Sequence, residues 1–163
     1  MSLKRKMLPI GVENFEKLRR NDLYYVDKTE MISDLIMNHG DANLFTRPRR
    51  FGKTLTMDML KTFFEIGQDA SLFDGLTISS HSDICEKYQN KYPVVFISLK
   101  GAAGSTYEKA DSMIKQLVAE EYQRHSYLAD SDILDSIEKD QFNRIRSISL
   151  NEGDLENSLR TLT

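Results

Sequence analysis

The sequence predicts an α/β fold in which helices flank a partial parallel sheet. Two short apolar stretches, at residues 42–46 (ANLFT) and 94–99 (VVFISL), have the composition of buried strands. Each stretch is followed by a glycine-containing turn and then by an amphipathic helix, and this repeated order is typical of a parallel sheet. A stable sheet usually has at least three strands. Because only two can be recognised, we expect the sheet to be incomplete.

We expect a single, incomplete domain over residues 1–163. It consists of a helical lead-in at 8–40, a strand, loop and helix at 42–66, a second strand and helix at 92–125, and a helical segment at 126–163. Apolar spacing and capping residues predict helices after Asn14, at about 28–38, 53–66, 80–90, 106–125 and 131–146, and from about Asp154 onward. The short run at 24–26 (YYV) is expected to be strand-like.

The composition excludes several classes of protein. The net charge of −3 gives no general indication of binding to nucleic acid or to a membrane. The charge is unevenly distributed, because residues 1–62 contain 12 basic and 8 acidic residues, whereas residues 63–163 contain 10 and 17. No apolar run approaches the roughly 18 residues that cross a bilayer. The single cysteine, Cys85, excludes an internal disulfide, so we expect a cytoplasmic protein that contacts no membrane.

The basic loop at residues 46–54 (TRPRRFGKT) is the segment that carries recognisable chemistry. A P-loop joins a strand to a helix, and its backbone N–H groups and the helix N-terminus hold phosphate oxygens. Here Gly52 permits close approach, Lys53 supplies a charge for the β- and γ-phosphates, and Thr54 supplies a hydroxyl for Mg²⁺. The sequence therefore predicts a phosphate-binding site.

The start of the loop departs from the usual P-loop pattern. Arg47 stands five residues before Gly52, where a glycine normally allows a tight turn at positive φ. Pro48 favours an extended conformation for Arg47, so we expect a wider loop or one with a different first turn. The alternative interpretation is a solvated basic turn that binds nothing.

Several segments together carry a resemblance to a known family. They contain the motifs YVDKT, RPRRFGKT and YPVVFISL and cover most of residues 8–104. Their order and spacing are similar to the start of the AAA-ATPase-like family of bacterial proteins. These are predicted P-loop ATPases that often carry a C-terminal nuclease-like domain of the PD-(D/E)XK type. In that family the first loop glycine is characteristically arginine, as Arg47 is here.

The resemblance implies a P-loop NTPase-like fold and a site for ATP and Mg²⁺. Lys53 would bind phosphate, and Thr54 would bind Mg²⁺ together with the nucleotide. The nucleotide-binding residues that it implies are Arg47, Pro48, Arg49, Arg50, Phe51, Gly52, Lys53, Thr54 and Leu55. Tyr25, Asp27 and Lys28 match an upstream motif of the family whose role the resemblance does not explain, and we favour Asp27 as a helix cap.

One part of an ATPase is missing from the sequence. Hydrolysis requires an acidic pair at the end of a second buried strand. The run at 94–99 is followed by lysine, and no other apolar run ends in acids. We therefore assign no catalytic residue and expect a truncated chain that binds the nucleotide without hydrolysing it. Exposed strand edges in such a chain would favour self-association.

Two other functions stay open. The chain could be a nucleic-acid-binding module whose basic half contacts phosphates, or a non-binding remnant that serves as an interaction domain. Nucleic-acid contacts would come from Lys4, Arg5, Lys6, Arg19, Arg20, Arg47, Arg49 and Arg50, with Tyr24 and Phe51 available for stacking, although we favour Phe51 as a core residue. The three histidines, His39, His81 and His125, are too scattered to suggest a metal site.

Overall fold

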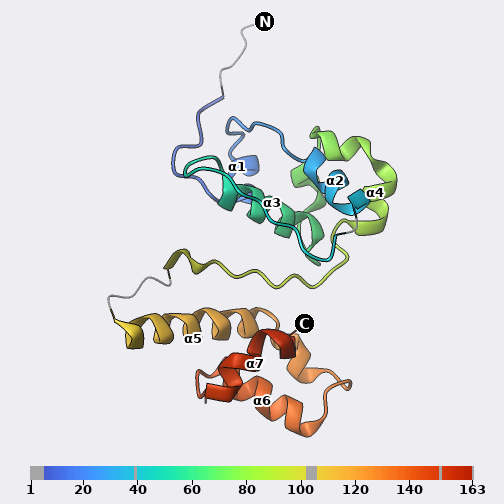
Figure 1. Cartoon of the computed structure of the whole chain (residues 1–163). Helices are drawn as coiled ribbons and strands as arrows, with labels where there is room; N and C mark the ends of the chain where they lie inside the picture. The colour runs from blue at the N-terminus through green and yellow to red at the C-terminus, as the bar shows by residue number, and fades with distance from the viewer. Residues whose placement is uncertain (1–5, 39, 102–105, 151, 163) are drawn as a thin grey trace, which may run out of the picture. The chain divides into compact units, whose positions relative to one another are not determined.

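The computed structural model describes residues 6–38, 40–101, 106–150 and 152–162 (Figure 1). The contacts divide the chain into two compact units, Met1–Val94 and Val95–Thr163. Each unit has its own cluster of buried apolar side chains. The two units are therefore described separately below.

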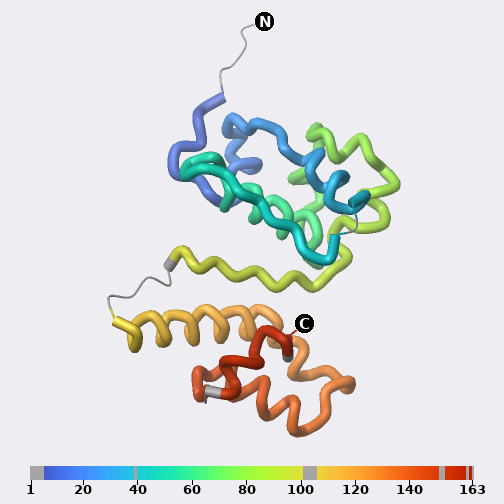
Figure 2. The backbone as a smooth tube through the Cα atoms, viewed as in Figure 1, coloured from blue at the N-terminus to red at the C-terminus, as the bar shows by residue number. Residues whose placement is uncertain are grey.

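The predicted α/β fold is wrong. Across the described ranges the regular elements are α- and 3₁₀-helices, and β-pairing is limited to one isolated parallel bridge between Glu65 and Tyr92. The predicted strands at 42–46 and 94–99 follow irregular paths up to Ser98, as does the run at 24–26 (Figure 2). A strand persists only where a neighbouring strand completes its backbone hydrogen bonds. Within the described residues no such neighbour exists, so the parallel sheet of a P-loop NTPase-like fold is not seen.

The helices predicted for the first unit are confirmed, with small differences at their ends. The unit contains α1 (Phe15–Arg20), α2 (Glu30–Asn38), α3 (Lys53–Phe64) and α4 (Ser82–Tyr88), with the 3₁₀-helices η1 (Ala70–Phe73) and η2 (Thr77–Ser80) between α3 and α4. Asn14 caps α1, because its side-chain oxygen accepts a hydrogen bond from the Lys17 N–H at 2.7 Å.

The core of the first unit is built around three phenylalanines. Phe15, Phe63 and Phe73 are buried, and the ring centroids of Phe15–Phe73 and Phe63–Phe73 lie 5.0 and 5.3 Å apart. Ile32 of α2 and Ile78 of η2 are fully buried in the same cluster. The apolar faces of α1, α2 and α3 therefore meet in one core, which holds α3 and the loop that precedes it.

Polar contacts fix α1 against its neighbours. One carboxylate oxygen of Asp58 on α3 accepts hydrogen bonds from the Phe15 N–H at 2.6 Å and from the Asn14 side-chain amide at 3.3 Å. The Arg19 guanidinium donates to the carbonyl oxygens of Leu72 and Asp74, both at 2.7 Å. These bonds satisfy groups at the start of α1 and connect it to α3 and η1.

Three α-helices make up most of the second unit within the described residues. It begins with η3 (Leu99–Gly101) and continues with α5 (Tyr107–Arg124), η4 (Ser126–Asp130), α6 (Ser136–Arg146) and α7 (Glu152–Leu162), which confirms the helices predicted for this region. Val118, Tyr122, Phe142 and Ile145 form its buried core. The Tyr122 hydroxyl donates to the carbonyl oxygen of Ser158 at 2.6 Å, and burial raises its pKa to about 12.

A buried carboxylate organises one end of α5. Glu121 accepts hydrogen bonds from the Phe96 N–H at 2.7 Å and from the Arg124 guanidinium at 2.6 and 2.8 Å. The His125 ring nitrogen lies 3.4 Å from the same carboxylate. Glu121 thereby holds the extended segment around Phe96 on α5 by a side-chain contact, where a sheet would have used backbone pairing.

Candidate functional site

The loop before α3 takes its sharp turns at positions other than Arg47. Arg50 and Gly52 have φ angles of 68° and 73°, whereas Arg47 is not among the residues with positive φ. Glycine adopts this conformation freely, and a residue with a side chain does so at a cost of about 1–2 kcal/mol. The turn that a first glycine would provide is thus displaced to Arg50 and Gly52, next to the helix.

Lys53 connects the two ends of this loop. It is the first residue of α3, and its ammonium group donates hydrogen bonds to the carbonyl oxygens of Arg47 and of Pro48, the latter at 3.1 Å. The side chain therefore reaches back across the loop. Its cationic end lies among the loop's backbone groups and remains accessible to solvent.

The N-terminus of α3 is open to an anion. Gly52 is its N-cap, no side chain caps the first turn, and the first turn contains no acidic residue. The N–H groups at such a helix end carry a partial positive charge. Thr54 lies in this first turn and is partly buried, and Leu55 packs against the core of the unit, which anchors the turn.

A second lysine approaches the loop from the start of α2. The Lys28 ammonium group donates to the Phe51 carbonyl oxygen at 3.3 Å. It also lies 3.6 Å from the place that a Cβ atom would occupy at Gly52. No local pattern in the sequence predicts this contact, because Lys28 and Phe51 are 23 residues apart.

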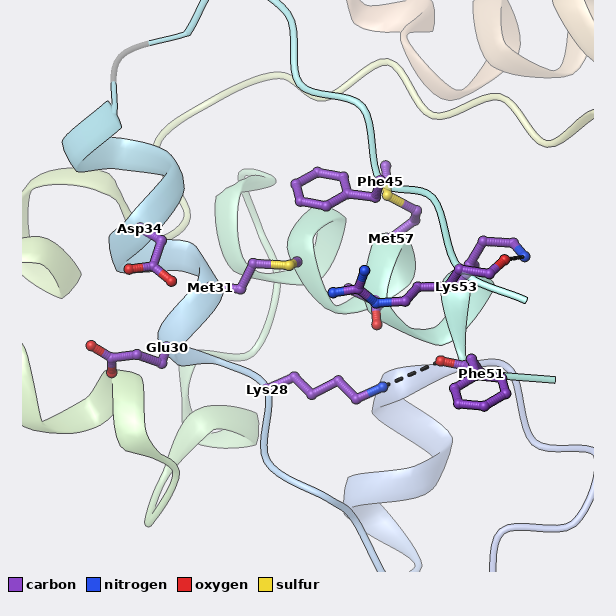
Figure 3. Close-up of a pocket in the computed structure, with 10 residues that line it drawn as sticks. Lys28, Glu30, Met31, Asp34, Phe45, Phe51, Lys53 and Met57 are labelled. Carbon is purple, nitrogen blue, oxygen red and sulfur yellow. Dashed lines mark hydrogen bonds between the residues drawn. The ribbon is translucent and has the colours of Figure 1, made fainter. Parts of the chain in front are cut away.

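The loop, α2 and the start of α3 line an open cavity of about 510 Å³ (Figure 3). Its cations come mainly from the loop side, its acids come from α2, and apolar side chains lie between them. The lining residues are Lys28, Glu30, Met31, Asp34, Phe45, Arg47, Phe51, Lys53, Thr56 and Met57. A cavity of this size that combines apolar side chains with convergent charged groups can hold a small molecule.

Comparison with known proteins identifies the family. Residues 9–159 match the family described as predicted AAA-ATPase. The chain belongs to this AAA-ATPase-like family.

An uncharacterized protein from the vnfD 5′ region of Azotobacter chroococcum mcd 1 is 36% identical over 117 residues, which are 71% of this chain and 21% of that protein. The chain thus spans about a fifth of the length of this curated relative. No solved structure matches the chain. Among the described residues, no helix is both long and apolar enough to cross a bilayer.

The motif upstream of the loop, which we matched to the AAA-ATPase-like family, has three separate structural roles here. The Tyr25 ring contacts Phe15 edge-on at 5.5 Å, and burial raises the pKa of its hydroxyl to about 12. Asp27 accepts hydrogen bonds from the N–H and hydroxyl groups of Thr29 and Thr77, at 2.7–2.8 Å. Its carboxylate therefore joins the segment before α2 to η2, which is a larger role than the helix cap that we favoured. Lys28 contacts the loop, as described above.

We expect the Asp27 contacts to make stability depend on pH. Partial burial raises the pKa of Asp27, but the hydrogen bonds from Thr29 and Thr77 lower it by more, so the folded-state pKa lies below its usual value. Its stabilising contribution is then present above the unfolded-state pKa of about 3.9 and is lost as the pH falls through the folded-state value. Asp27→Asn should lower the free energy of unfolding by about 1–2 kcal/mol at pH 7.

Urea denaturation of the wild type and of Asp27→Asn at pH 7 and at pH 3 or below measures this dependence. The difference between the two proteins should shrink at the lower pH. Thr77→Ser keeps the donor hydroxyl and should behave like the wild type, whereas Thr77→Val should lose part of the contribution. A difference that stays constant over this pH range would show that the Asp27 charge is not responsible.

Several basic residues of the N-terminal half already contact other groups of the protein. Arg20 forms ion pairs with Glu16 and Asp69, and Lys6 pairs with Asp22 at 2.5 Å. Arg19 donates to backbone carbonyls, as described above. Lys4 and Arg5, which we also predicted as phosphate contacts, lie outside the described residues. The arginines of the loop itself, Arg47, Arg49 and Arg50, are exposed.

The structure also places the two aromatic residues and the histidines that the sequence analysis singled out. The placement of Phe51 in the core is wrong, because its side chain is 61% exposed at the edge of the loop. Tyr24 is also exposed, at 51%. Of the histidines, His39 lies outside the described residues, and His81 contacts Glu30 at 3.1 Å. Among the described residues, no three histidine, cysteine or acidic side chains gather in a group that could hold a metal ion.

Proposed function

We propose that the loop at residues 47–55 binds the phosphate groups of a nucleotide, with ATP and Mg²⁺ as the expected ligands. The observation that carries this proposal is the position of Lys53. Lys53 is the first residue of α3, whose first turn has no side-chain cap, and its ammonium group reaches back to the loop's own carbonyl oxygens. A lysine ammonium group and the N–H groups at a helix N-terminus are donors that suit a phosphate group.

The remaining loop residues fit this ligand. Gly52 brings the backbone close without a side chain, and Arg47, Arg49 and Arg50 add positive charge around it. The Thr54 hydroxyl, in the first turn of α3, offers the kind of oxygen ligand that Mg²⁺ takes beside a phosphate. Membership of the AAA-ATPase-like family supports the same assignment. The proposal concerns binding, and no residue is assigned to hydrolysis.

Isothermal titration calorimetry with Mg-ATP tests the proposal. The Lys53→Met variant removes the charge and keeps most of the side-chain length. We expect it to weaken binding by about 10- to 100-fold, since a hydrogen bond to a charged group contributes about 1.5–3 kcal/mol. Lys61→Met is the matched control, because Lys61 lies in the last turn of the same helix and outside the cavity. Its affinity should equal that of the wild type.

Two results would contradict the proposal: a wild-type protein that binds no Mg-ATP, or equal affinities for the wild type and Lys53→Met. Circular dichroism of both variants should show unchanged helix content. Lys53 is exposed, and the hydrogen bonds of its ammonium group go to the backbone carbonyls of Arg47 and Pro48, outside the helix.

A second candidate function rests on a different observation. The exposed loop arginines stand beside Phe51, whose ring is 61% exposed. Exposed aromatic and cationic side chains together can bind single-stranded nucleic acid by stacking and phosphate contacts. Titration of a labelled oligonucleotide at increasing salt distinguishes the two functions. A steep loss of affinity with salt, together with no response to Mg-ATP, would favour nucleic-acid binding.

A further inference from the structure

The cavity beside the loop has charges of opposite sign at its two ends. In Figure 3, Lys53 and Phe51 mark the loop side, and Glu30 and Asp34 lie on α2 at the other side. Met31, Phe45 and Met57 lie between them. Lys28 and Arg47 also line the cavity, and the Lys28 side chain extends from the residues before α2 to the loop, where its ammonium group donates to the Phe51 carbonyl oxygen. The cavity therefore has cationic groups toward the loop, an apolar wall, and acidic groups on α2.

The apolar wall is more accessible than a core surface would be. Met57 is 42% exposed although it lies on α3, one turn beyond the start of the helix, and Phe51 is 61% exposed at the loop. Met31 and Phe45 are partly buried. Methionine side chains adapt their shape and make favourable contacts with flat rings. A planar apolar group bound here would cover surface that water now contacts, which is favourable.

We propose that this cavity holds the base of the nucleotide whose phosphates the loop binds. The inference rests on the proposed function and extends it to a second part of the ligand. A nucleotide is anionic at its phosphate end and has a flat, largely apolar base at the other, and the cavity presents matching surfaces in the same order. The base would contact Met31, Phe45 and Met57.

The acidic end sets the direction in which the nucleotide lies. Ionised carboxylates accept hydrogen bonds and repel phosphate oxygens. Glu30 and Asp34 therefore disfavour phosphate groups at the α2 end and can accept hydrogen bonds from N–H groups of a base. Glu30 also contacts His81, at 3.1 Å, which restrains its carboxylate. The phosphates are thus directed toward Lys53 and the base toward α2.

Calorimetry with two ligands, Mg-ATP and inorganic tripolyphosphate with Mg²⁺, separates the base from the phosphates. The test variant is the double substitution Phe45→Ala/Met57→Ala, which trims the apolar wall and leaves every lysine and arginine in place. We expect its affinity for Mg-ATP to fall by about tenfold or more, the effect of losing one stacking contact. Its affinity for tripolyphosphate should stay within about twofold of the wild type.

A matched double variant controls for the loss of apolar surface. Met37 and Leu44 are 63% and 89% exposed and do not line the cavity. Met37→Ala/Leu44→Ala therefore removes one methionine and one neighbour of Phe45 without touching the wall. Both ligands should bind it as they bind the wild type.

The outcomes distinguish this inference from the proposed function. If the wild type binds Mg-ATP no more tightly than tripolyphosphate, or if Phe45→Ala/Met57→Ala keeps wild-type affinity for Mg-ATP, the base site is overturned and phosphate binding by the loop stands. Equal losses for both ligands in this variant also overturn it, because the substitution then acts on the loop. If the wild type binds neither ligand, both proposals fail.

Discussion

Replacing Phe63 with alanine is expected to lower the free energy of unfolding of the first unit by about 4 kcal/mol. Phe63 lies on α3, is 0% exposed, and contacts the rings of Phe64 and Phe73 at 5.1 and 5.3 Å. Its removal leaves a cavity among residues that cannot all move to fill it. Because α3 also supports the loop, we expect the variant to lose ligand binding as the unit unfolds.

Hydrogen exchange measured by mass spectrometry reports this effect by region. In Phe63→Ala, amides of α1, α3 and α4 should lose protection, while amides of α5, α6 and α7 should keep theirs, since each cluster of buried residues lies within one unit. Phe51→Ala is the matched control, because Phe51 is 61% exposed and should contribute little. Similar protection in both variants would contradict the proposed core.

Replacing Glu121 with alanine is expected to destabilise the second unit by about 3 kcal/mol. The residue is 3% exposed, and its carboxylate holds the Phe96 N–H and the Arg124 guanidinium. The substitution removes the carboxylate that the Phe96 N–H and the Arg124 guanidinium share as an acceptor. Removing one member of a charge pair whose carboxylate is buried usually costs more than the pair itself contributes.

Chemical denaturation followed by hydrogen exchange tests this prediction. Protection should fall in α5, α6 and α7 and remain unchanged in α1 and α3. Glu120→Ala is the control, because Glu120 is the neighbouring residue, is exposed, and accepts a hydrogen bond from Gln116 on the same helix. Glu121→Gln keeps an acceptor oxygen and should show a smaller loss. Equal stability of Glu120→Ala and Glu121→Ala would show that the carboxylate is not an organising contact.

The helices could be predicted because their signals are local. Apolar residues at helical spacing predicted α3 and α5, and Asn14 at the start of α1 accepts the hydrogen bond expected of a cap. The start of α6 also has a local signal in the sequence. Asp135 and Glu138 form a capping box at the start of α6, which the pattern Asp-x-x-Glu indicates before the structure is known.

Strands could not be predicted in the same way, because a strand depends on a partner elsewhere in the chain. The run at 94–99 is rich in β-branched and aromatic residues, which fit a strand only when neighbours pair with it. In the structure, the Tyr92 N–H donates to Phe64 and the Ile66 N–H donates to Tyr92, both at 2.9 Å, and the pairing then ends. The Phe96 N–H instead finds a side chain, Glu121.

Only the contiguous part of the candidate site could be predicted, because its other residues come from distant parts of the chain. Gly52 and Lys53 could be found from the sequence, because the phosphate-loop pattern is contiguous. The contribution of Lys28 and the acidic residues of α2 depends on how α2 lies beside the loop, and no short pattern records that. The partner of Asp27 is likewise distant, since Thr77 lies 50 residues further along the chain.

The contacts of Lys53 with Arg47 and Pro48 have a consequence for the thermodynamics of binding. A lysine side chain carries about 2 kcal/mol of rotamer entropy, and ordering it on binding would oppose association. Here much of that entropy is already lost when the chain folds, since the ammonium group is held by two carbonyl oxygens before a phosphate arrives. A phosphate bound at the proposed site would replace these carbonyl oxygens as the acceptor. We therefore expect the contribution of Lys53 to appear mainly in the enthalpy of binding.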